Sequence, residues 1–207
     1  MRSYLVKASI MAVLMAGLTI GSSSRTPGNQ AQKRNWRFYK NARWDFCIRY
    51  PATWKSIVPT DGSGIELYPQ GSFKAERADY IEVGALPNQR QNIGNPSAIA
   101  DNSSPLELGQ IFARSLDGLR EYQGASDIRV VKKLSVRYQG YSAQETVIRY
   151  HSRPRGTRWI QRTLWVNRDE VIFAVTLRAR STTYRELLPY FMQLVRHGLR
   201  ITCPGSR

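Results

Sequence analysis

Residues 128–178 decide the fold, because four strand-like segments follow one another there with only short turns between them. The segments are Ile128–Tyr138 (IRVVKKLSVRY), Ala143–His151 (AQETVIRYH), Arg158–Asn167 (RWIQRTLWVN) and Val171–Arg178 (VIFAVTLR). They are rich in Val, Ile, Thr, Tyr and Trp, which favour strands. Connections as short as Gln139-Gly140 join antiparallel neighbours. The sequence therefore predicts an antiparallel four-stranded meander.

Shorter strands and two helices surround the meander. The strand candidates are Asp45–Tyr50, Ile65–Tyr68 and Tyr80–Leu86. Ser104-Pro105-Leu106-Glu107 fits a capping box with proline at the first helical position, so a helix is expected from there to about Tyr122. A second helix is expected over 183–197, with its own capping box and a distortion at Pro189. Together these elements predict an α+β fold with helices packed on an antiparallel sheet.

The first strand carries a short motif. Phe46, Ile48 and Tyr50 alternate, Pro51 stops the strand, and Trp54 can fold back over its apolar face. This motif resembles the opening of the PsbP-like family, and the likeness extends over roughly residues 44–203. The resemblance implies an α/β/α sandwich whose members are mostly non-catalytic and include exported bacterial proteins. It brings no active-site signature with it, and nothing outside the motif indicates a photosynthetic partner.

The N-terminus has the three parts of a secretory signal. Arg2 and Lys7 precede an uncharged apolar run over 8–20, and small residues follow over 21–24. We expect residues 1–24 to be a cleaved signal peptide, 25–43 a flexible basic leader and 44–207 a single domain. The mature protein is then exported, in a periplasmic or extracellular location. No later segment is apolar enough for a transmembrane helix.

The two cysteines of an exported chain favour one disulfide, between Cys47 and Cys203. Such a bridge would join the first predicted strand to the C-terminal segment. Two free thiols, one of them reactive, are the alternative.

The charge is unevenly distributed. Residues 128–207 hold sixteen positive and four negative side chains, whereas 45–127 hold seven positive and eleven negative. An Arg-rich half can bind phosphate or carboxylate surfaces. Export makes nucleic acid an improbable partner and favours an anionic envelope component or an acidic protein. A solvated strand face is the structural alternative.

One basic hairpin is the candidate binding site. It contains Arg153, Arg155, Arg158 and Arg162, with Trp159 among them. Guanidinium groups beside an indole suit docking on an acidic or phosphorylated surface, although a solvated turn would have the same composition.

The sequence offers no recognisable catalytic motif. His151 and His197 lack metal-binding spacing, and no P-loop, nucleophile elbow or dinucleotide fingerprint occurs. We therefore expect no catalytic residue, no metal and no cofactor, and a non-catalytic binding or accessory domain. The alternatives are a hydrolase whose site has no readable motif and a carrier of a small apolar ligand.

Overall fold

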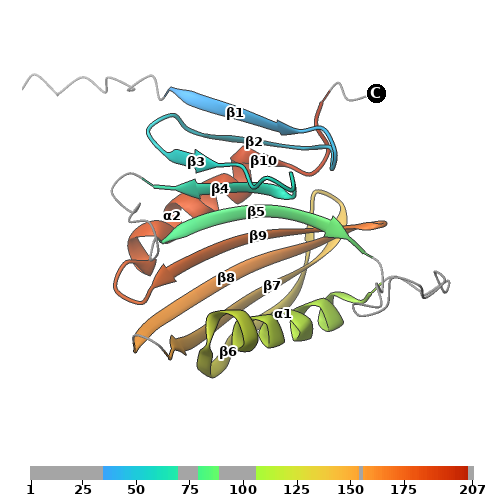
Figure 1. Cartoon of the computed structure of the whole chain (residues 1–207). Coiled ribbons are helices and arrows are strands. Elements are labelled where there is room, and N and C mark those ends of the chain that lie inside the picture. Colours follow the sequence, from blue (N-terminus) through green and yellow to red (C-terminus); the bar gives the residue numbers. More distant parts are fainter. Residues whose placement is uncertain (1–34, 70–78, 89–105, 154–155, 205–207) are drawn as a thin grey trace, which may run out of the picture. The chain divides into compact units, whose positions relative to one another are not determined.

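The structure is a computed structural model that describes residues 35–69, 79–88, 106–153 and 156–204. Within them, seven strands form a large sheet in the order β3-β4-β5-β9-β8-β7-β6 (Figure 1). These strands are β3 (Lys55–Ile57), β4 (Gly64–Tyr68), β5 (Tyr80–Pro87), β6 (Ala125–Tyr138), β7 (Tyr141–Ser152), β8 (Thr157–Arg168) and β9 (Val171–Arg180). Every neighbouring pair is antiparallel. The predicted meander is β6 to β9.

A smaller sheet has the order β1-β2-β10, with β1 (Trp36–Asn41), β2 (Phe46–Pro51) and β10 (Leu199–Arg200). The strand β1 lies inside the range 25–43, which was predicted to be a flexible leader. That prediction is wrong for residues 36–41, because they pair with β2 along its whole length. The predicted signal peptide lies outside the described residues.

The two faces of the large sheet are covered by different elements. On β9, Phe173 belongs to the main core together with Phe191 of helix α2 (Tyr184–Gln193). The next residue back, Ile172, points the other way and packs with Ile111 of helix α1 (Leu108–Gln123). Successive strand side chains alternate between faces. We therefore distinguish an α1 face and an α2 face of the large sheet.

The small sheet lies on the α2 face. Phe46 of β2 meets Phe173 edge to face, with 5.8 Å between ring centroids. The predicted α+β class is confirmed in its coarser form, a mostly antiparallel sheet with few helices.

The capping interactions at the N-termini of both helices differ from the predicted ones. The first helix begins at Leu108 with a capping box between Glu107 and Gln110, and Gly124 ends it in the left-handed conformation. The predicted box began at Ser104, which lies outside the described residues. At the second helix, Thr183 is the N-cap but makes no side-chain capping bond. Its hydroxyl instead donates to Asp79, 2.8 Å away, because this buried carboxylate lies within reach.

The second helix is also shorter than predicted. It ends at Gln193, and residues Leu194–Gly198 form a single π-helical turn, η1. Pro189 lies within α2, inside the range where the helix was predicted. None of the helices in the described part of the chain is long and apolar enough to cross a membrane.

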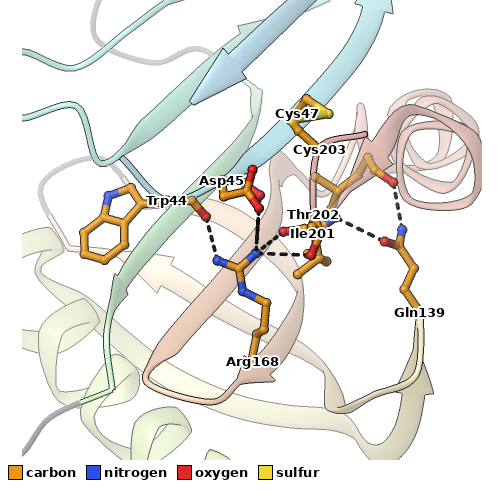
Figure 2. The surroundings of a disulfide bond; sticks show 9 residues. Trp44, Asp45, Cys47, Gln139, Arg168, Ile201, Thr202 and Cys203 are labelled. Atoms are coloured by element: carbon orange, nitrogen blue, oxygen red, sulfur yellow. Dashed lines mark hydrogen bonds and ion pairs between the residues drawn. A yellow bond between two sulfur atoms is a disulfide. The ribbon is translucent and has the colours of Figure 1, made fainter. Parts of the chain in front are cut away.

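Cys47 and Cys203 form the predicted disulfide, with 5.5 Å between their Cα atoms (Figure 2). Beside it, the guanidinium of Arg168 donates to the carbonyl oxygens of Trp44, at 2.8 Å, and Ile201. Gln139 accepts from the backbone N–H of Ile201 and donates to the carbonyl of Leu199. Two strand ends of the meander therefore hold the C-terminal segment against β2, together with the disulfide.

Candidate functional site

The residues of the predicted basic hairpin do not form one surface. Arg153 is exposed in the turn after β7, and Arg158 is exposed on β8. Arg155 lies outside the described residues. Trp159 is buried and Arg162 is half-buried. Because Trp159 is flanked by Arg158 and Ile160 on a regular strand, its side chain points to the opposite face from theirs.

Trp159 is a core residue of the α1 face. It packs in a cluster with Phe112 and Leu119 of α1, and the guanidinium of Arg178 lies 4.7 Å above its ring. Because the indole is buried, it has no accessible face to offer a partner.

Arg162 is on the α2 face, where it forms an ion pair with Glu145 of β7. Lys132 of β6 contacts the same carboxylate. Burial alone would raise the pKa of Glu145, but the hydrogen bond from Lys132 and the charge of Arg162 together hold it below its ordinary value. The guanidinium of Arg162 is therefore held within the fold by Glu145, a carboxylate that it shares with Lys132.

Two arginines that the sequence analysis did not select complete the basic surface. Arg129 of β6 and Arg149 of β7 lie directly opposite each other and are both exposed. Arg149 also pairs with Ile160, and Ile160 pairs with Ala179 of the main core, so these side chains share the α2 face. Arg158 lies two residues from Ile160 on the same face, diagonal to Arg149.

We call Arg129, Arg149 and Arg158 the basic face; Arg153 lies in the adjoining turn. Among the described residues, none of the three makes an ion pair or a side-chain hydrogen bond. The nearest carboxylate along the strands, Asp127, contacts His151 at 3.2 Å. None of the three positive charges of the basic face is therefore paired with a carboxylate among the described residues, although Asp127, through its contact with His151, lies beside them.

Successive side chains of a strand point to opposite faces, so the sequence alone could have shown that Trp159 and Arg158 do not share a surface. The Arg129–Arg149 pair could not be found that way, because β6 carries register shifts between Ser126 and Arg129 and between Val130 and Lys132. In the part of the chain that the structure describes, no three His, Cys, Asp or Glu side chains gather as a metal site would require.

Comparison with known proteins supports the fold. No family model and no curated protein matches the chain. Among solved structures, the cyanobacterial PsbP (CyanoP) of Synechocystis is similar, with 11% identity and a TM-score of 0.51, over 81% of this chain and 92% of that one. At this identity the likeness concerns the fold alone. The chain has a PsbP-like fold, as the motif at Phe46–Trp54 predicted.

Two further solved structures are similar at lower TM-scores. The protein PA94 of Pseudomonas aeruginosa, of unknown function, has 11% identity and a TM-score of 0.45, over 79% of this chain and 95% of that one. LpqN of Mycobacterium tuberculosis, involved in cell envelope biogenesis, has 11% identity and a TM-score of 0.44, over 84% of this chain and 88% of that one.

Proposed function

We propose that this chain is an exported accessory domain that docks on an anionic component of the cell envelope through the basic face. The observation that carries this proposal is the Arg129–Arg149 pair, with Arg158 diagonal to it and no acidic partner within the described fold. Like charges directly opposite on neighbouring strands destabilise a sheet. A bound phosphate or carboxylate surface would remove that cost, so the arrangement favours an anion.

Export is part of the proposal. Its supports are the N-terminal signal pattern over 1–24 and the Cys47–Cys203 disulfide, since disulfides persist in oxidising compartments. The α/β/α layering implied by the family resemblance also belongs to the proposal, with α1 and α2 as the outer layers on opposite faces of the large sheet.

The test compares two sets of three substitutions. In the first, Arg129, Arg149 and Arg158 are each changed to Gln. In the second, the same number of charges is removed from exposed arginines of α1, α2 and η1, namely Arg114, Arg185 and Arg196. Both proteins and the wild type are applied to vesicles of phosphatidylglycerol, vesicles of phosphatidylcholine and an isolated cell-wall polymer fraction.

Each arginine near an anionic membrane surface contributes about 1 kcal/mol, so the first set should weaken binding to the anionic probe by roughly a hundredfold. The second set should weaken it much less, and phosphatidylcholine should bind none of the proteins. Equal retention of the first set and the wild type would contradict the proposal. Equal losses in both sets would show that net charge alone is responsible and not the basic face.

A further inference from the structure

A second surface, made by other elements, has the composition of a peptide-binding groove. A shallow hollow, open to solvent and with enclosed room for about one water molecule, lies between the small sheet and the second helix. Three aromatic side chains line it, Trp36 of β1, Trp54 after β2 and Tyr190 of α2. The remaining lining residues are Arg49, Pro51, Gln193 and Leu194. We propose that this groove binds an extended acidic segment of a partner protein, which lays an apolar side chain across the rim of the hollow, against Trp36 and Tyr190.

The strand register explains one wall of the groove. On β1 and β2, Trp36 lies opposite Pro51, and Phe38 lies opposite Arg49. All four side chains therefore share the face of the small sheet that points away from the core, since Tyr39 and Ile48 point into it. Phe38 is 66% exposed at this face, which extends the aromatic surface beyond the hollow.

The second helix supplies the other wall. The ring of Tyr190 meets Trp54 edge to face, with 5.5 Å between centroids. Trp54 is only 5% exposed, whereas Tyr190 is 44% exposed. The buried indole thus fixes the orientation of a tyrosine that is itself accessible. Rigid aromatic side chains of this kind dominate the binding energy of protein interfaces.

The charge at the groove identifies the partner as acidic. The guanidinium of Arg49 lies 5.1 Å from the centroid of the Trp36 ring. Within the described residues it makes no ion pair and no hydrogen bond, so its donors are free to bind a carboxylate. No carboxylate is among the residues that line the hollow.

The hollow is too small to enclose a complete small molecule. Pockets for small-molecule ligands enclose roughly 300–1,000 Å³, whereas the enclosed part of this hollow has room for about one water molecule. Grooves lined by tryptophan and tyrosine typically receive extended segments, one apolar side chain or proline ring at a time.

The test is a selection of a displayed library of random peptides on the purified protein. We expect enriched sequences to place Asp or Glu within a few positions of Pro, Leu or an aromatic residue. The most enriched peptide is then synthesised with a label, and its affinity is measured for the wild type and for the double variant Arg49→Glu, Tyr190→Ser. Both positions are exposed, so the variant should fold, and its thermal unfolding is recorded alongside.

The double variant should bind the labelled peptide at least about tenfold more weakly than the wild type. The matched control is Arg149→Glu, which makes the same charge change on the basic face and should bind the peptide as the wild type does. The proposal is overturned if no peptide is enriched, or if the double variant binds the enriched peptide equally well. It is also overturned if the double variant binds phosphatidylglycerol vesicles more weakly than the wild type but binds peptides equally well, because the groove would then contact lipid.

Discussion

Arg129 on β6 and Arg149 on β7 lie directly opposite each other, with both guanidinium groups exposed on one face of the large sheet. Repulsion between opposed like charges costs a sheet some tenths of a kcal/mol. The fold therefore carries a small electrostatic cost at the surface that we propose as its docking face. Stability and binding should respond in opposite directions when that cost is removed.

Arg149→Gln should raise the free energy of unfolding by about 0.2–1 kcal/mol while weakening binding to anionic vesicles. Urea denaturation at low and high salt measures the first effect, and the gain should shrink at high salt because exposed charges are screened. Arg114→Gln, an exposed arginine of α1, serves as the control and should leave stability unchanged. A loss of stability in Arg149→Gln would show that this arginine has a favourable partner in solution.

The disulfide should contribute strongly to stability. It closes a sequence separation of 156 residues, and loss of a native bridge typically costs about 2–5 kcal/mol. The double variant Cys47→Ala, Cys203→Ala should therefore unfold at a markedly lower temperature than the oxidised wild type. Adding a reductant should lower the melting temperature of the wild type toward that of the variant and leave the variant unaffected. Equal melting temperatures of oxidised wild type and variant would contradict this.

Local sequence signals predicted the meander well, and non-local pairings account for what was missed. The strands β6 to β9 consist of strand-favouring residues and are joined by short turns, so residues close together in the sequence specify each hairpin. The strand β1 was missed because its exposed Arg37 and Lys40 resemble a basic leader; only pairing with β2 makes the segment a strand. The hydroxyl of Thr183 was predicted to cap its own helix but donates to Asp79, which lies more than a hundred residues earlier in the chain.

The candidate site was predicted in part for the same reason. Arg153 and Arg158 are exposed as a basic hairpin requires, but a sequence pattern does not show that Arg162 has Glu145 beside it. The cross-strand partners of an arginine depend on register, and the two register shifts in β6 alter that register. Likewise, Trp36 and Tyr190 meet at one groove only because α2 packs near β2, far along the chain.

Two half-buried glutamates should give opposite pH dependences. Burial, with the neighbouring Glu66, raises the pKa of Glu82 above 4.5 although Arg178 opposes the shift. The folded state then holds this proton more tightly than the unfolded state, so stability falls as the pH rises through the folded pKa of Glu82. Glu82→Gln should therefore stabilise the protein at pH 7 and have little effect near pH 4.

Glu145 is the internal contrast to Glu82. Its folded pKa is lowered, so its contribution is present above the unfolded value of 4.5 and is lost as the pH falls through the folded pKa. Glu145→Gln should destabilise the protein at pH 7 and less so at acidic pH. Urea denaturation of both variants between pH 3 and 8 tests the pair. Parallel curves for the two variants would refute the assignment.

Gly64 of β4 and Gly84 of β5 lie directly opposite each other but should tolerate alanine very differently. A Cβ atom on Gly64 would lie 2.1 Å from the carbonyl oxygen of Val83 and 2.8 Å from the Cα of Gly84. Both atoms are backbone, so neighbouring strands would have to separate. A Cβ atom on Gly84 would meet only the flexible carboxylate of Glu82, at 3.7 Å.

Gly64→Ala should therefore cost about 2–3 kcal/mol of stability, as overpacking of a core does. Gly84→Ala should change stability by less than about 1 kcal/mol and in the favourable direction, because glycine is a poor strand residue. The midpoints of urea unfolding at unchanged m-value measure both effects. Similar midpoints for the two variants would mean that β4 and β5 are not in the register that places Gly64 against the backbone of Val83.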